Sequence, residues 1–461
     1  MGFKEKLYQS LPVFLQNAAI SYFGYTWRKR RFGGIFQKEL NACKERESYD
    51  ADQWQHYLNN SLQSMLCFAY REVPFYQMKF QQAGFTENDL QAITQQDLHR
   101  IPFLEKNELR LFGETTLLAK TAEPGRQFYA SSGSTGTPTK ICFSTAMHQR
   151  WSAAFEARIR HWAGIDNRMA RGMIGGRRVL PEGNARPPFY RYNLAEKQVY
   201  YSAYHISPAN ASNYVEAMYH YKLQYMTGYA VSNYLLALYI QQKQLKAPQM
   251  KAVVTSSEKL TPEMREVLEE VYQCKTYDSW SGVEACALVT ECEAGSLHIS
   301  EDVGIIEILD EHGNEVAEGE TGEVVCTGLL NFDQPLIRYR IGDRMTKGKG
   351  RCKCGRSMPV IQEIEGRMED VVTGPDGRQM VRFHGIFVGI PEIERAQVIQ
   401  HQLDEIEIRI QHEKPIELQQ QELIRQRMIS QLGNVLVRIS LYQKIEQTPN
   451  GKYKAVISHI K

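Results

Sequence analysis

The central half of the chain alternates short β-prone runs with helical stretches, and this alternation restricts its fold more than any other feature. It extends from about residue 125 to about residue 345. KAVVTSS (251–257) predicts a buried strand, and TPEMREVLEEVYQ (261–273) predicts a helix that opens at Thr261, with proline at the next position. A chain with this pattern is expected to be an α/β protein.

The segments on either side of this centre differ from it. Residues 1–120 read as mostly helical, most clearly over Asp52–Ala69, and Pro74 stops that run. After about residue 370 the sequence predicts a strand, a helix with Gly433 as its C-cap and a second strand, which together make a small α+β module. We therefore expect two domains in this chain of 461 residues, 1–369 and 370–461.

Composition and charge argue against several classes of protein and of binding partner. The chain has 55 basic and 53 acidic residues, a net charge of +2, which gives no reason to expect nucleic acid. Nine cysteines are too few for a disulfide scaffold and favour a reducing, cytoplasmic location. Because no run approaches 18 apolar residues, we expect no membrane span, and residues 1–25 lack the features of a signal peptide. We expect a monomer or a homodimer.

A basic run, WRKRRFGG, follows the first helical segment at Trp27–Gly34. It has two interpretations, a membrane-surface patch or a solvated helix end. Four charges near one helical turn prefer water, so the solvated helix end is favoured.

Within the stretch YASSGSTGTPTKICFS (Tyr129–Ser144), the segment Ser131–Thr137 contains five Ser and Thr hydroxyls and two glycines, and a β-prone run follows it. The glycines at 133 and 136 allow a tight turn whose backbone N–H groups can form an anion-binding nest, and Lys140 can add a positive charge. The spacing fits neither the Walker pattern nor G-x-G-x-x-G. By composition alone, a plain Ser/Gly surface loop remains open.

Five further segments occur in a fixed order: SEKL (257–260), YDSWSGVEA (277–285), PLIRYRIGD (335–343), EGRMED (365–370) and TPNGK (448–452). In order and rough spacing they resemble the core motifs of the adenylate-forming superfamily, over roughly residues 60–461. The N-terminal segment Val73–Arg110 and the compact LIRYRIGD resemble most the phenylacetate–CoA ligase branch and its capsule-biosynthesis relatives. This resemblance implies a large N-terminal adenylate-forming domain with mixed sheets and a small mobile α+β C-terminal domain.

The resemblance also implies a reaction. An AMP-forming ligase joins a carboxylic acid to the α-phosphate of ATP, releases pyrophosphate and passes the acyl group to an acceptor. Anion meets anion in the first step, so the site must supply positive charge, including Mg²⁺. CoA is the favoured acceptor. Transfer to an amine, such as an amino sugar in envelope polysaccharide synthesis, and a non-catalytic nucleotide-binding relative both remain open.

The motif positions imply site residues. The phosphate loop would hold the β- and γ-phosphates with Ser131, Ser132, Gly133, Ser134, Thr135, Gly136, Thr137 and Lys140. Glu284 matches the Mg²⁺ ligand, Trp280 the ring that stacks on adenine, and Asp343 the acceptor of the ribose hydroxyls. The remaining nucleotide contacts would come from Ser257, Glu258, Tyr277 and Arg367.

Two more positions would act when the C-terminal domain moves. Glu369 falls at the hinge, and Lys452 matches the lysine that bridges the carboxylate and the α-phosphate. The sequence also departs from the family pattern. Thr139 separates Lys140 from the loop proline, and Val283 stands where a small hydroxyl residue usually precedes the glutamate.

Three cysteines and a histidine could form a separate metal site. Cys352 and Cys354 lie in a tight RCKCGR turn, and Cys292 precedes His298 in ECEAGSLH. Three thiols and an imidazole make a tetrahedral zinc set, and by the resemblance both segments flank the same β-rich region. Four unrelated residues remain the alternative. A disulfide between Cys352 and Cys354 is disfavoured by the small ring and the reducing compartment.

The acyl pocket is expected near Tyr204–His205, Gly228–Tyr229 and Ser279–Trp280. Many tyrosines between Phe189 and Tyr234 favour an aryl or planar acid, although tyrosine is also common in cores. Nearby arginines could instead meet a polar acid or the phosphates of CoA; they are Arg171, Arg177, Arg178, Arg186 and Arg191. The sequence leaves this choice open.

Overall fold

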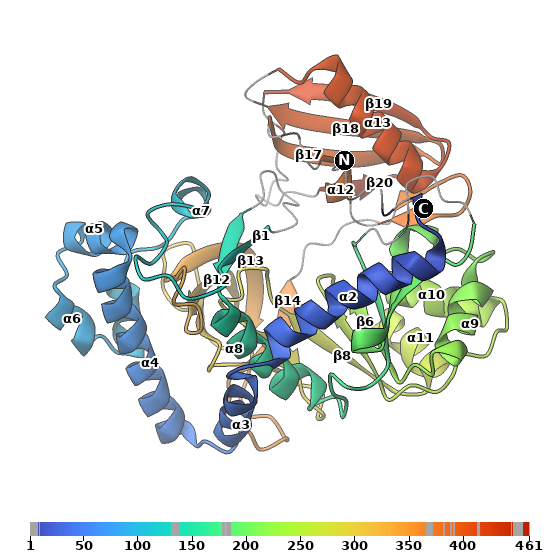
Figure 1. Cartoon of the computed structure of the whole chain (residues 1–461). Helices are drawn as coiled ribbons and strands as arrows, with labels where there is room; N and C mark the ends of the chain where they lie inside the picture. Colours follow the sequence, from blue (N-terminus) through green and yellow to red (C-terminus); the bar gives the residue numbers. More distant parts are fainter. Residues whose placement is uncertain are drawn as a thin grey trace.

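The structure is a computed structural model that describes residues 8, 10–130, 139–177, 180, 186–365, 372–380, 383–387, 390, 392–412, 415–443, 445 and 455–460. A large mixed sheet forms its centre, and a smaller sheet lies apart at the C-terminal end (Figure 1). The predicted α/β class, with a separate C-terminal α+β unit, is confirmed.

The large sheet has twelve strands in the order β11-β12-β13-β14-β10-β9-β8-β7-β6-β3-β5-β4. Strands β5, β3, β6, β7 and β8 pair in parallel, and the remaining pairs are antiparallel. The bounds are β3 Arg171–Gly175, β4 Tyr190–Asn193, β5 Gln198–Ser202, β6 Tyr225–Tyr229, β7 Ala252–Ser256, β8 Lys275–Trp280, β9 Val289–Glu291, β10 Leu297–Ile299, β11 Gly304–Leu309, β12 Thr321–Gly328, β13 Tyr339–Lys347 and β14 Val360–Glu365.

Helices pack on the parallel part of this sheet. The predicted strand at 251–257 is β7, and the predicted helix at 261–273 is α11 (Pro262–Tyr272), whose N-cap Thr261 accepts the backbone N–H of Met264. The other helices here are α8 Thr145–Phe155, η2 Glu156–Arg160, η3 Leu194–Glu196, η4 Ala203–His205, α9 Ala211–His220 and α10 Ala230–Gln242. Buried side chains of α9, α10 and α11 form one core with those of β3, β5 and β6.

The N-terminal part is helical, as predicted. Helix α4 (Ala51–Glu72) contains the predicted run, begins with a capping box between Asp50 and Gln53, and buries one face against the antiparallel strands. Pro74 both ends this helix and starts α5 (Pro74–Gln82), because proline fits the first turn of a helix. The other helices are α2 Val13–Phe32, α3 Phe36–Arg46, α6 Glu87–Ala92, η1 Gln95–Arg100 and α7 Lys106–Phe112. Among the helices described, none is long and apolar enough to cross a membrane.

The C-terminal unit has a four-stranded sheet, β19-β18-β17-β20, and the helix α13 (Leu418–Leu432) with Gly433 at its C-cap. The strands are β17 Ile393–Gln402, β18 Glu405–His412, β19 Leu436–Tyr442 and β20 Val456–Ser458, with β15 Val372–Thr373, β16 Gln379–Met380 and α12 His384–Phe387 nearby. Its buried apolar residues form their own core, against which Tyr204 of the large unit packs. The boundary at 369/370 stays a prediction, because residues 366–371 lie outside the described residues.

A buried charge cluster joins the N-terminal helices to the large sheet. Asp302 accepts hydrogen bonds from Arg158 at 2.8 Å and from Arg46 at 3.0 Å, and Arg158 also binds Glu47 at 2.8 Å. The neighbouring Glu301 is 8% exposed, and burial together with the charge of Asp302 raises its pKa to about 8. The carboxyl group of Glu301 therefore loses its proton at a lower pH in the unfolded chain than in the folded protein.

This raised pKa predicts a pH-dependent gain in stability on Glu301→Gln. The ordinary pKa of glutamate is 4.5, so the unfolded state loses the proton first and wild-type stability falls as pH rises from 4.5 to about 8. Relative to wild type, the variant should gain on the order of 3–5 kcal/mol across that window. Denaturant unfolding at several pH values measures this difference in the free energy of unfolding. The exposed control Glu318→Gln should follow wild type, and a parallel pH dependence in all three proteins would contradict the prediction.

Candidate active site

The candidate site lies at the carboxyl ends of β7 and β8, which pair in parallel within the large sheet. Ligands of open α/β sheets bind at such ends. Just after β7, Ser257 has a left-handed backbone (φ +72°), and Oε2 of Glu258 accepts the backbone N–H of Val231 at 2.9 Å at the start of α10. The structure thus brings Ser257 and Glu258 to the expected edge. Their contact with a nucleotide stays a prediction.

Trp280 and Asp343 meet at this edge. The indole Nε1–H of Trp280, the last residue of β8, donates to Oδ2 of Asp343 at 3.0 Å. Asp343 follows Gly342, which has φ +87°, and the pairing of β12 with β13 shifts register there. A shift of this kind re-aims side chains along a strand. Two predicted nucleotide contacts, 63 residues apart, are therefore fixed against each other.

Glu284 lies buried behind this pair, at 6% exposure. The hydroxyl of Thr139 donates to its Oε1 at 3.3 Å. Burial, and after it the charge of Glu284, raises the pKa of Tyr339. A buried carboxylate with one weak donor keeps lone pairs for a hard cation, so Glu284 fits the predicted Mg²⁺ ligand.

The side chains of Lys140 and Thr139 have different surroundings from those that the sequence indicates. The side chain of Lys140 is 51% exposed and ends in an ion pair with Glu114 at 2.7 Å. Thr139, which interrupts the family pattern, is fully buried and is the residue that reaches Glu284. The departure noted in the sequence therefore corresponds to a contact inside the candidate site.

Three residues that sequence reasoning missed hold the hairpin of β1 (Gln127–Ala130) and β2 (Lys140–Phe143) beside the site. Gln334 Oε1 accepts the N–H of Cys142 at 2.7 Å, and Asp333 Oδ2 accepts the N–H of Ser144 at 3.1 Å. Asn331 Nδ2 donates to the carbonyl of Cys142 at 3.1 Å. All three side chains are buried. They directly precede PLIRYRIGD, and the available signal was NFDQ (331–334), where three of four residues have an amide or carboxylate side chain.

Several predicted residues lie outside the described residues. They are the phosphate-loop residues 131–137, Arg367, the hinge residue Glu369 and Lys452. The two strands that flank the phosphate loop are described, and they pair from Gln127–Phe143 to Ala130–Lys140. The loop is thereby attached at both ends to the hairpin that Asn331, Asp333 and Gln334 hold.

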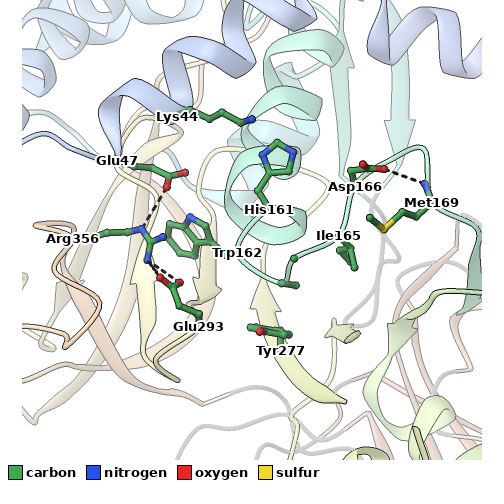
Figure 2. Close-up of a pocket in the computed structure, with 12 residues that line it drawn as sticks. Lys44, Glu47, His161, Trp162, Ile165, Asp166, Met169, Tyr277, Glu293 and Arg356 are labelled. Atoms are coloured by element: carbon green, nitrogen blue, oxygen red, sulfur yellow. Dashed lines mark hydrogen bonds and ion pairs between the residues drawn. The ribbon is translucent and has the colours of Figure 1, made fainter. Parts of the chain in front are cut away.

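The side chain of Tyr277 lies on the side of the sheet opposite to that of Trp280. Positions 277 and 280 of β8 face opposite sides of the sheet, since successive strand residues alternate. Figure 2 shows Tyr277 lining a hollow of about 800 Å³ with Trp162, Lys44 and His161. In that hollow Arg356 donates to Glu293 at 2.9 Å and lies 3.6 Å from Glu47. The structure therefore does not bring Tyr277 to the other predicted nucleotide contacts.

The predicted metal set comes together beside this hollow. The ligand atoms of Cys292, His298, Cys352 and Cys354 all lie within 4.8 Å of one another. The Sγ atoms of Cys292 and Cys352 are 3.6 Å apart, and Cys354 Sγ is 3.4 Å from His298 Nε2. A tetrahedral zinc site has S–S edges of about 3.8 Å and S–N edges of about 3.6 Å. The separations fit a zinc ion.

The protonation of these groups also fits a metal. His298 Nδ1 lies 3.0 Å from the carbonyl of Met358, which can only accept, so Nε2 keeps its lone pair for the metal. Burial raises the pKa of Cys352, but hydrogen bonds from Ser296, Cys354 and His298 outweigh it and lower the pKa to about 6. Burial raises the pKa of Cys292 to about 11. All nine cysteines are free thiols, so the disfavoured disulfide is not formed.

The aromatic and basic residues of the expected acyl pocket are largely structural. Tyr201 and Tyr214 are buried, and each donates to a backbone carbonyl of the neighbouring segment. Arg191 is buried and binds Gln16, and Arg171 binds the carbonyl of Glu196. Arg171 and Arg191 thus make contacts within the protein, whereas Arg177 is exposed and Arg178 lies outside the described residues. A contact of these arginines with a polar acid or CoA stays a prediction. His205 stacks on Phe189 with ring centroids 4.8 Å apart.

Comparison with known proteins gives relatives along the whole chain. Residues 373–459 match the family model described as the CapK C-terminal domain. Protein CapK of Staphylococcus aureus is 22% identical, with 99% of each chain covered. Phenylacetate-coenzyme A ligase of Thermus thermophilus is 24% identical over 83% of this chain and 85% of its own. The crystal structure of 2-hydroxyisobutyryl-CoA ligase with 2-HIB-AMP and CoA superposes with a TM-score of 0.58 at 20% identity, covering 90% and 91% of the chains.

A large mixed sheet with a separate C-terminal domain is the fold that the chain shares with 2-hydroxyisobutyryl-CoA ligase. The chain is similar to CapK over almost its whole length and to the phenylacetate–CoA ligases over most of it. The resemblance expected from the motifs is thereby confirmed.

Zinc occupancy of the Cys/His set stays a prediction that metal analysis can check. The purified chain should contain about one zinc per molecule, and Cys354→Ser should lose most of it. Removing the metal with a chelator should lower stability by about 3 kcal/mol or more, because a ligand far above its Kd stabilises the fold it binds. Cys274→Ser, at a half-buried thiol elsewhere, is the control. Wild-type protein that contains no zinc, and whose stability a chelator does not change, would contradict the prediction of a zinc site.

Proposed function

We propose that this chain is an ATP-dependent, AMP-forming ligase that activates a carboxylic acid as an acyl-adenylate and transfers the acyl group to CoA. One observation carries the proposal: the Trp280–Asp343 pair lies at the carboxyl edge of β8, where the motif segments place the nucleotide. The relatives whose names specify an activity are coenzyme A ligases. This agreement supports the same reaction here.

Each residue has a task in the first half-reaction. The ring of Trp280 offers a face to adenine, and its N–H holds one oxygen of Asp343, so that the other is directed to the ribose. Glu284 would hold Mg²⁺, which neutralises phosphate charge when bound. The hydroxyls and backbone N–H groups of residues 131–137 would bind the β- and γ-phosphates, with Lys140 at the edge of the loop.

The second half-reaction needs a different arrangement of the C-terminal unit. During adenylation Lys452 bridges the carboxylate and the α-phosphate, and Arg367 contacts ribose or phosphate. Rotation at Glu369 then removes Lys452 and admits the acceptor thiol. We place this activity in the cytoplasm, where ATP, CoA and reduced thiols occur together.

A pyrophosphate assay tests the proposal directly. The chain is incubated with ATP and Mg²⁺ across aryl, fatty, amino and sugar acids, with and without CoA. Acid-dependent release of pyrophosphate would support adenylation, and AMP formation that rises with CoA would support thioester transfer. Nucleotide binding without release on any acid would favour a non-catalytic relative and contradict the proposal.

A second candidate acceptor is an amine, such as an amino sugar. The observation that favours it is the match of residues 373–459 to the CapK C-terminal domain, together with the similarity of the chain to protein CapK, because the motifs also resemble the capsule-biosynthesis relatives. If adenylation proceeds but CoA leaves AMP formation unchanged, amino sugars become the acceptors to test.

Lys452→Ala should separate the two half-reactions. Because a single positive charge is lost where two anions approach, adenylation should fall by about 10²–10³-fold, the usual effect of losing one electrostatic contact. Thioester formation from preformed acyl-adenylate should stay within about twofold of wild type, since Lys452 has left the site by then. Lys251→Ala, at an exposed lysine remote from the motifs, is the control. Equal losses in both steps would exclude the bridging role.

Trp280→Phe tests the hydrogen bond to Asp343 apart from stacking. Phenylalanine keeps a ring face but removes the N–H, so Asp343 is no longer held. The KM for ATP should rise about 5- to 10-fold, as for one lost hydrogen bond of about 1–1.5 kcal/mol, with a smaller change in kcat. Trp151→Phe in α8 controls for a general effect of losing an indole. An unchanged KM would show that the bond does not position the nucleotide.

A further inference from the structure

Helix α2 contacts the edge of the large sheet through several polar groups. Its inner side binds the edge strand β4 and the η3 turn through polar groups: Asn17 Oδ1 accepts the N–H of Tyr192 at 3.0 Å, and Ser21 Oγ accepts the N–H of Leu194 at 3.0 Å. Arg28 donates to the carbonyl of Ala195 at 3.3 Å. Gly24 packs against Asn193, where a Cβ would collide. Surface helices normally turn their apolar side inward.

The outer side of α2 is correspondingly apolar. Positions 14, 18, 22, 25 and 29 share one face of a helix, and they hold Phe14, Ala18, Tyr22, Tyr25 and Lys29. Phe14 is 69%, Tyr22 75% and Tyr25 61% exposed. Leu194 in the adjoining η3 turn, 67% exposed, extends this surface. Figure 1 shows α2 running along the outside of the molecule. We call Phe14, Tyr22, Tyr25 and Leu194 the α2 outer face.

Basic residues are concentrated in and around helix α2. From Lys6 to Lys38 the sequence has six basic residues and no acidic one. Lys29 lies on the outer face at the end of α2, and Lys38 and Lys197 are exposed on the segments that follow α2 and η3. The sequence predicted a solvated basic helix end, but three of the four cations bind within the protein: Arg28 as described above, Arg30 to His148 at 2.9 Å, and Arg31 to Glu196.

We propose that the α2 outer face docks in the plane of an anionic phospholipid membrane. Aromatic side chains on one side of a helix, with lysine at its border, are the features that bind a helix to the lipid interface. Tyrosine suits this region because its ring is apolar and its hydroxyl stays hydrated. The polar inner side stays on the protein, so the helix lies on the bilayer and does not span it.

Charge favours lipid over a second copy of the chain. A twofold contact pairs a surface with itself. Among the residues that the structure describes, α2 itself carries arginine and lysine side chains and no carboxylate, so two copies would bring like charges together. Acidic headgroups supply the missing negative charge. The proposal concerns location and does not depend on the proposed reaction.

Vesicle flotation with the full-length chain tests the docking. We expect binding to vesicles of phosphatidylcholine mixed with phosphatidylglycerol, weak binding to phosphatidylcholine alone, and loss of the difference at high salt. Tyr22→Ser with Tyr25→Ser should weaken binding at least about tenfold, because two interfacial rings are removed. Lys29→Gln should weaken it about fivefold, the effect of one charge near an anionic surface.

Matched changes elsewhere serve as controls. Leu111→Ser with Leu418→Ser removes two large apolar side chains of similar exposure, 71% and 80%, and Lys243→Gln removes an exposed lysine. These variants should bind vesicles as wild type does. Thermal unfolding and nucleotide binding show that every variant is folded.

Three outcomes would overturn the proposal. One is no binding of the wild type to anionic vesicles. Another is equal binding by the Tyr22/Tyr25 variant and the Leu111/Leu418 control. The third is a wild-type dimer that becomes a monomer on the tyrosine changes without any vesicle binding, which would assign the α2 outer face to contact between copies. Pyrophosphate release is measured separately, so failure of docking and failure of the proposed reaction are distinguishable.

Discussion

The attachment of the β1–β2 hairpin to the large sheet depends on three buried polar side chains. Asn331, Asp333 and Gln334 satisfy backbone groups of Cys142 and Ser144, and Arg126 neutralises Asp333 at 2.7 Å. Buried polar groups of this kind must all be paired, because each unpaired one costs its desolvation energy. The hairpin therefore has one favourable position, and that position delivers Thr139 to Glu284 and fixes both ends of the phosphate loop.

The polar contacts also differ between the two sides of the large sheet. At the carboxyl edge the indole of Trp280 binds one of the two carboxylate oxygens of Asp343. On the other side, a cluster of ion pairs links α3, Asp302 and the segment that carries Arg356, next to the Cys/His set. A metal there would secure the antiparallel end of the sheet, whereas the proposed reaction takes place at the carboxyl edge.

Strong local patterns made the elements and the family predictable. The helix at 261–273 has its cap and proline, β7 is a continuous apolar run, and Gly433 ends α13. The surroundings of Arg171 and Arg191 could not be predicted, because an arginine gives the same sequence signal whether it binds a ligand or a backbone carbonyl. Tyr277 was grouped with Trp280 because a motif records neighbours in sequence, while a strand sends them to opposite faces.

The sequence by itself determined the fold class, the two-part organisation, the order of the motifs and the residues able to bind a nucleotide or a metal, because these depend on local periodicity and side-chain chemistry. Only the tertiary structure decided which of them meet. The approach of Cys292 and His298 to Cys352 and Cys354, and the pairing of Trp280 with Asp343, join segments about 60 residues apart. The sequence also did not determine which side of α2 faces the large sheet, because that depends on the groups of the neighbouring segments that the helix contacts.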